Sequence, residues 1–140
     1  GAPTLVGEFG IPFDLNGRVA FRTGDFGVAE LAMDRSYRAM DDALASATLW
    51  NYTADNSNAR GDRWNDEDLS IYSPDQRTNP RDRNSGGRAL RAAVRPYATA
   101  TAGTPLRMRF NYLSGAFVYR FRSDPAVAAP TEIFVPRLHY

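Results

Sequence analysis

The start of the chain alternates between short apolar segments and one long amphipathic segment. Thr4 to Val6 and Thr48 to Thr53 have the composition of short strands. Between them, from Phe26 to Leu44, apolar residues recur at spacings of three and four, which predicts a helix that Asp25 can cap. The order strand, helix, strand predicts a βαβ crossover in a parallel sheet. Such sheets carry their functional residues at the C-terminal ends of the strands.

A long polar segment follows, from Asp55 to Gly87. Segments of this length without regular structure are usually either functional loops or disordered. Trp64, Leu69, Ile71 and Tyr72 are interleaved with its polar residues and provide apolar anchors, so we expect an ordered loop. After it, residues 88–95 have the pattern of a short helix, which Pro96 ends.

The period of the apolar pattern changes to two in the last third of the chain. Residues 98–105 are small and turn-prone, and we expect them to form a linker. Leu106 to Tyr112 and Phe117 to Phe121 then alternate apolar and polar residues around a short turn, which predicts an antiparallel hairpin. A third strand is predicted from Glu132 to Val135. Three strands are too few for a sandwich, which needs a second sheet over the first.

Charge and composition exclude several classes of function. The 17 basic and 16 acidic residues give a net charge of +1 and are interspersed, so nothing indicates a nucleic-acid partner. All the basic residues are arginine, which excludes Schiff-base, P-loop and kinase lysines. The absence of cysteine excludes disulfides, thiolate metal sites and thiol nucleophiles. The single histidine, His139, is next to the last residue, where we expect a frayed surface position.

Glu8 is the strongest candidate for chemistry, because it lies between apolar residues at the end of the first predicted strand. A carboxylate there is costly to desolvate unless it is used in catalysis or paired with an arginine, and both interpretations remain open. Trp50 follows the second strand and fits either stacking on a sugar ring or core packing. The loop from Asp55 to Asp68 offers many hydrogen-bonding groups to a hydroxyl-rich ligand, or is simply solvated.

Several segments together resemble successive motifs of the endoglycoceramidases and related glycosylceramidases of glycoside hydrolase family 5. The segments are Gly7–Gly10, Leu49–Asn56, Gly61–Ser70, Ser85–Leu90 and Thr131–Pro136. The resemblance implies that residues 1–97 are the last two units of a (β/α)8 TIM barrel. It also implies that residues 106–140, after the linker 98–105, open an antiparallel β-sandwich. The fold class is then α/β followed by β.

The same resemblance assigns roles to individual residues. Glu8 takes the position of the catalytic nucleophile, and Trp50 that of an aromatic residue beneath the sugar. Asn56 and Trp64 join it as substrate-binding residues. The acid/base glutamate of the family lies in an Asn-Glu dipeptide, which does not occur in this sequence. Because the chain also begins without methionine, we expect it to be the C-terminal piece of a longer enzyme, inactive without the N-terminal portion.

The implied activity is that of a retaining endo-glycosidase that hydrolyses the linkage between glycan and ceramide in glycosphingolipids, without a metal or organic cofactor. A β-glucosidase acting on another lipid glycoside, such as a steryl glucoside, is the alternative within this family. A non-catalytic carbohydrate-binding module is the alternative outside it, and predicts Glu8 paired with an arginine and Trp50 buried. The expected partners are the glycosphingolipid, the missing portion and, transiently, a membrane surface. The resemblance also implies a secreted protein.

Overall fold

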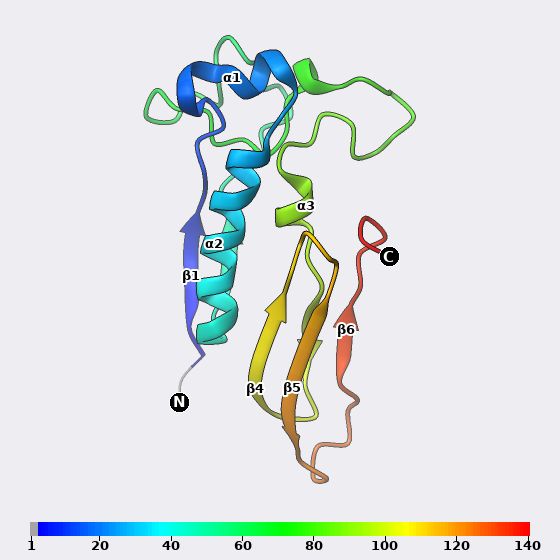
Figure 1. Ribbon diagram of the computed structural model, residues 1–140. Coiled ribbons are helices and arrows are strands. Elements are labelled where there is room, and N and C mark those ends of the chain that lie inside the picture. Colours follow the sequence, from blue (N-terminus) through cyan, green and yellow to red (C-terminus); the bar gives the residue numbers. More distant parts are fainter. Residues whose placement is uncertain (1–2) are drawn as a thin grey trace.

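A computed structural model describes residues 3–140, so that Gly1 and Ala2, the start of the predicted barrel portion, lie outside it. Strand β1 (Leu5–Phe9) pairs in parallel with β2 (Ser46–Leu49), and helix α2 (Gly27–Ala43) lies between them in the chain. The predicted βαβ crossover is therefore confirmed (Figure 1). The N-cap of α2 is Phe26 and not Asp25, although the Asp25 carboxylate accepts a hydrogen bond of 2.8 Å from the Gly27 N–H at the start of the helix.

Helix α1 (Leu15–Thr23) was not predicted, and it lies beyond the end of β1 (Figure 1). None of its residues is buried, and its first turn contains Asn16 and Gly17, residue types with low helix propensity. Its first turn is also irregular, because Asn16, Gly17 and Arg18 have left-handed φ angles of 55°, 66° and 61°.

The second strand was predicted too far along the chain, since β2 ends at Leu49 and not at Thr53. The reason lies in the hydrogen bonds of Asn51. Its N–H donates to the Leu69 carbonyl at 3.2 Å, and its carbonyl accepts from the Ile71 N–H at 2.9 Å. These groups pair with the returning loop and not with β1, so the hydrogen bonds between β1 and this segment end with the one from the Trp50 N–H to the Phe9 carbonyl.

The polar segment is an ordered loop, as expected. It contains one 3₁₀ turn, η1 (Pro74–Gln76), and returns to the body of the molecule at α3 (Leu90–Ala93). The predicted helix over residues 88–95 is thus shortened to a single turn. Six polar residues from this part of the chain, Asn56, Asp68, Ser70, Ser73, Arg88 and Arg95, are buried.

Four strands make up the rest of the chain. They are β3 (Tyr97–Ala100), β4 (Gly103–Phe110), β5 (Phe117–Ser123) and β6 (Glu132–Phe134). Strands β4 and β5 form the predicted antiparallel hairpin, and β3 pairs antiparallel with β6. The expected linker, residues 98–105, is therefore wrong as an irregular connection, because it holds most of β3 and the start of β4. Its small residues fit strand geometry once β6 supplies a partner.

Arg95 links helix α2 to strand β4. Its guanidinium donates to Asp34 at 3.1 Å and to Asp41 at 2.8 Å, both on α2, and lies 4.9 Å from the Tyr37 ring centroid and 5.0 Å from that of Phe110 on β4. The apolar core lies next to this cluster, since Tyr37 packs against it and Met33 of α2 is fully buried in it. No helix among residues 3–140 has the length and apolar composition needed to cross a membrane.

His139 is not frayed as expected. Its Nε2 lies 2.8 Å from the Val94 carbonyl, and its ring is 4.8 Å from that of Phe110 in an edge-on contact. The position of His139 near the end of the chain did not predict its structure, because contacts with Val94 and Phe110, which are distant in sequence, hold the imidazole in place.

Candidate active site

Glu8 lies in an irregularity of β1. Val6 pairs with Ala47 and Phe9 with Leu49, so Gly7 and Glu8 together stand opposite one residue of β2. Bulges of this kind redirect a side chain and occur often beside active sites. Glu8 is exposed, and within residues 3–140 its carboxylate has no ion pair and no hydrogen-bond donor. No arginine among residues 3–140 pairs with Glu8, so its carboxylate is accessible.

Trp50 is held beside Glu8 by the backbone. The Trp50 N–H donates a hydrogen bond of 2.7 Å to the carbonyl of Phe9, the residue after Glu8. Gly10 allows this close approach, because a Cβ atom at that position would lie in hard contact with the Trp50 carbonyl oxygen. The ends of β1 and β2 therefore place the carboxylate and the indole at the same edge of the sheet. The Trp50–Asn51 peptide bond is cis.

Trp64 is brought to the same place by the loop. Its ring centroid is 5.4 Å from that of Trp50, with the planes inclined by 59°, and its side chain is 53% exposed. Trp50 is half-buried, so it is not a core residue only. Tilted aromatic rings with accessible faces suit the C–H faces of a sugar. The structure thus brings the rings of Trp50 and Trp64 together, and it links the Trp50 backbone to Phe9, the residue after Glu8.

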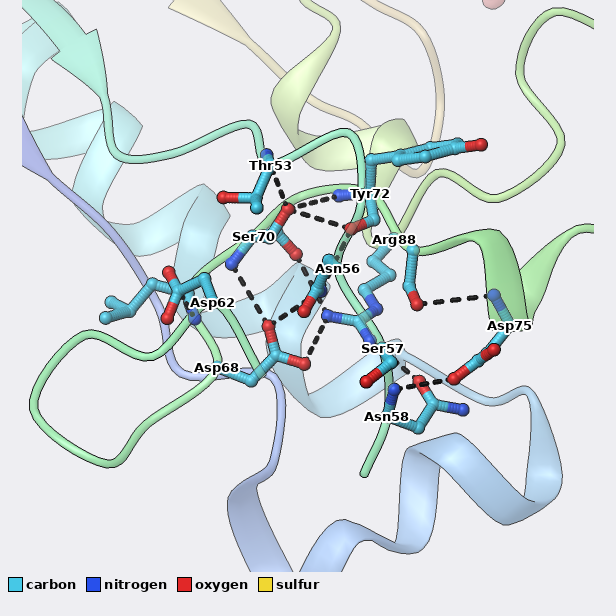
Figure 2. Close-up of polar contacts among 12 residues, drawn as sticks. Thr53, Asn56, Ser57, Asn58, Asp62, Asp68, Ser70, Tyr72, Asp75 and Arg88 are labelled. Carbon is cyan, nitrogen blue, oxygen red and sulfur yellow. Dashed lines mark hydrogen bonds and ion pairs between the residues drawn. The ribbon is translucent and has the colours of Figure 1, made fainter. Parts of the chain in front are cut away.

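Asn56, the fourth predicted residue, lies inside the loop and is 2% exposed. Its amide donates to Asp68 Oδ1 at 3.0 Å and to the Tyr72 carbonyl at 3.1 Å (Figure 2). Asp68 in turn forms an ion pair with Arg88 at 2.8 Å, with the two side chains 3% and 0% exposed. These contacts shape the loop from within, so the geometry favours a supporting position for Asn56.

Arg88 is the centre of this polar cluster (Figure 2). Besides Asp68 it donates to the Ser70 carbonyl at 3.0 Å and to Asn58 Oδ1 at 2.8 Å. Its guanidinium lies 4.5 Å from the ring centroid of Phe21 in α1, a cation–π contact. Burial lowers the pKa of Arg88, and the neighbouring carboxylate of Asp68 opposes that shift. The loop is thereby fastened both to itself and to α1.

Asp68 and Arg88 were not singled out by sequence reasoning. Charged residues are common throughout this loop, and nothing local distinguishes a buried pair from solvated ones. The two residues are 20 positions apart in the sequence, so no local pattern indicates their contact. Asp68 lies in the segment Gly61–Ser70 and Arg88 in the segment Ser85–Leu90, but the sequence does not show that these two segments contact each other.

A crevice lies away from this edge of the sheet. This crevice of about 570 Å³ separates α2 from β3, β4 and β6, lined by Tyr37, Met40, Tyr97, Met108 and Phe134 among others. Among residues 3–140, no group of three or more His, Cys, Asp and Glu side chains is arranged to hold a metal ion.

Comparison with known proteins assigns the C-terminal strands first. Residues 95–140 match the glycoside hydrolase family 5 C-terminal domain. A glucosylceramidase from Cryptococcus neoformans var. grubii is 43% identical over 96% of this chain. An endoglycoceramidase I from Rhodococcus hoagii is 52% identical over 39% of it.

A solved structure agrees with these relatives. The crystal structure of Cryptococcus neoformans sterylglucosidase 1 with tris superposes with a TM-score of 0.87 at 36% identity, and covers 96% of this chain. This chain spans 20% of the length of the Cryptococcus glucosylceramidase, 11% of the Rhodococcus enzyme and 21% of the sterylglucosidase structure. The similarity thus covers nearly all of this chain and a minor part of each relative.

Proposed function

We propose that this chain supplies the nucleophile and part of the sugar site of a retaining glycosidase acting on lipid glycosides. The premise is that the chain belongs to the glycoside hydrolases of family 5. One observation carries the proposal. Glu8 lies in a bulge at the C-terminal end of β1, next to the half-buried Trp50, and within residues 3–140 its carboxylate is exposed and has no ion pair. The carboxylate is therefore accessible to a substrate.

The chemistry follows from the carboxylate. Glu8 attacks the anomeric carbon of the sugar attached to the lipid, and the bond between that carbon and the glycosidic oxygen breaks. A glycosyl ester with Glu8 forms while a general acid protonates the departing oxygen. Water then attacks the anomeric carbon from the face opposite Glu8 and gives a proton to the former general acid, which now acts as a base, while the bond to Glu8 breaks and frees its carboxylate. The two displacements together retain the anomeric configuration. Trp50 and Trp64 hold the ring by stacking against its C–H faces.

The general acid is supplied from outside residues 1–140. In a retaining enzyme the two carboxyl groups lie about 5 Å apart. Two carboxylates of the loop, Asp62 and Asp68, are engaged in hydrogen bonds within it, and the Asn-Glu dipeptide that carries the acid/base glutamate in the family that the chain resembles does not occur in the sequence. We therefore propose that the chain is the C-terminal portion of a longer enzyme and is inactive by itself.

The same proposal extends to the architecture. Residues 1–97 would be the last two units of a (β/α)8 barrel, with β1 and β2 as its final parallel strands. Strands β4 and β5, and β3 with β6, would be the first strands of the β-sandwich. The free edge of β1 and the exposed side chains of Leu5 and Val6 support a neighbouring strand in the complete protein.

The substrate that we propose first is a glycosphingolipid, cleaved between glycan and ceramide. The 52% identity to an endoglycoceramidase I across part of the chain supports it. A steryl glucoside is the second candidate, because the superposition on sterylglucosidase 1 covers 96% of this chain. Both aglycones are departing alcohols, so the nucleophile and its chemistry are the same in either case.

The proposal is tested by Glu8→Gln in the full-length protein. The amide has the shape of the carboxylic acid but cannot form the glycosyl ester, so turnover of glucosylceramide, a ganglioside and a steryl glucoside should fall by several orders of magnitude. An unchanged melting temperature shows that the variant is folded. The panel of three substrates decides between the two lipid classes. Substantial residual turnover by a folded Glu8→Gln variant refutes the assignment of the nucleophile.

A further inference from the structure

The Asp62 carboxylate accepts three hydrogen bonds from three different parts of the chain. Asn51 Nδ2 donates to Oδ2 at 2.6 Å, the Leu69 N–H donates to the same oxygen at 3.3 Å, and the Trp64 N–H donates to Oδ1 at 3.1 Å. Asn51 directly follows Trp50, and Trp64 carries the second aromatic ring of the site. One carboxylate thus joins the side chain of the residue after Trp50 to the backbone of Trp64.

The segment from Arg63 to Glu67 needs such an anchor. All its residues are exposed, and three of them, Arg63, Asn65 and Asp66, have left-handed φ angles of 66°, 50° and 59°. Residues other than glycine pay for this conformation, and it persists only where the surrounding structure enforces it. Within the described chain, Asp62 provides the one side-chain hydrogen bond that this segment receives.

We propose that Asp62 is a positioning residue that fixes Trp64 against Trp50, and so sets the width of the sugar site. The proposal rests on the proposed function, since it assigns to the two rings the role of holding the sugar. Asp62 acts through them and does not touch the reacting atoms. Without its carboxylate, residues 63–67 have no side-chain tether, and Trp64 moves away from Trp50.

The role requires both oxygens of a carboxylate, which makes Asp62→Asn the decisive substitution. An amide has one acceptor and one donor. If its nitrogen replaces Oδ1, it faces the Trp64 N–H. If its nitrogen replaces Oδ2, it faces both the Asn51 amide and the Leu69 N–H. Either orientation loses bonds and opposes donors, although the shape of the side chain is unchanged. Asp66→Asn is the matched control, because Asp66 is exposed in the same loop and makes no side-chain hydrogen bond with residues 3–140.

The spectroscopic test uses the full-length protein and the coupling between two indole rings 5.4 Å apart. The circular dichroism of the wild type minus that of Trp64→Phe isolates the exciton couplet of this pair. We expect the couplet to be kept in Asp66→Asn and lost in Asp62→Asn. Asn51→Ala, which removes one donor from the other side, should weaken it and serves if Asp62→Asn does not fold. A couplet of wild-type size in Asp62→Asn overturns the positioning role. If Asp62→Asn does not fold, a couplet of wild-type size in Asn51→Ala overturns it instead.

Kinetics separate this inference from the proposed function. We expect kcat/KM on the preferred lipid glycoside to fall about tenfold in Asp62→Asn, which corresponds to about 1.4 kcal/mol of transition-state binding, and to stay near the wild-type value in Asp66→Asn. In a Trp64→Phe background, Asp62→Asn should cause little further loss, because its effect passes through that ring. A full additional tenfold loss there overturns the inference. Loss of the couplet with wild-type kcat/KM also overturns it, whereas an active Glu8→Gln variant refutes the proposed function independently.

Discussion

Arg88 and Asp68 form an ion pair of 2.8 Å in which neither side chain has more than 3% of its surface exposed. Removing one partner leaves a buried charge without compensation, which costs about 3–5 kcal/mol of unfolding free energy. We therefore expect Asp68→Asn to destabilise the protein strongly in denaturant titration. The wider pair of Arg91, whose side chain is 54% exposed, and Glu30, 3.9 Å apart, is the control, and Arg91→Gln should cost less than about 1 kcal/mol. Equal effects of the two variants would contradict the buried role of the cluster.

Arg95 offers a test of geometry at constant charge. Its two terminal nitrogens bond separately to Asp34 and Asp41, and its planar group lies near two aromatic rings. A lysine has a single ammonium and cannot reproduce this fork, so Arg95→Lys should lower the melting temperature by several degrees. Arg38, which lies 4.0 Å from the same Asp34 and is 55% exposed, provides the control. Arg38→Lys should leave the melting temperature within about a degree of the wild type, as expected for a surface pair.

Gly10 and Gly7 provide a matched pair on and beside β1. A methyl group at Gly10 would meet the Trp50 carbonyl, whereas a methyl group at Gly7 finds no atom within 4 Å in the described structure. Gly10→Ala should therefore shift Trp50 and reduce kcat/KM on the lipid glycoside, even in variant protein that remains folded. Gly7→Ala tests the alternative that any added methyl group in this segment disturbs the site. Similar losses in both variants would argue against a specific contact between Gly10 and Trp50.

Trp50→Ala should reduce kcat/KM by about tenfold or more, a loss of roughly 1.4 kcal/mol or more in transition-state binding, because the sugar loses its aromatic support. Trp50→Phe keeps an aromatic face and should recover part of the loss. Tyr52→Ala removes a neighbouring ring that is 66% exposed and should change little. If the fraction of unfolded protein accounts for the whole effect of Trp50→Ala, the residue is a core residue and its proposed role fails.

Local patterns predicted the βαβ unit and the hairpin because both depend on short-range periodicity. The helix over residues 26–44 and the alternation in β4 and β5 follow from spacings of three to four and of two. The predictions that failed concern features that depend on contacts with residues distant in the sequence. Strand β2 ends early because Asn51 pairs with the loop, and β3 exists because β6 lies beside it.

The candidate site divides in the same way. Glu8 and Trp50 follow directly after apolar segments of the sequence, so their place at the edge of the sheet could be predicted. Asn56 could not be placed, because its burial depends on Asp68 and Arg88, the latter 32 residues away by their numbering. The three hydrogen bonds of Asp62 likewise join residues that no periodicity connects.

The central claim, that Glu8 is the nucleophile, is tested most directly by trapping the glycosyl ester. The full-length protein is incubated with a 2-deoxy-2-fluoro glycoside bearing a good leaving group, and the labelled peptide is then identified by mass spectrometry. Fluorine slows both displacements, and the good leaving group speeds formation of the ester, so the ester accumulates. The account predicts a single modification, on the carboxylate of Glu8, and none in Glu8→Gln. A label on any other acid, or turnover without a covalent intermediate, would contradict it.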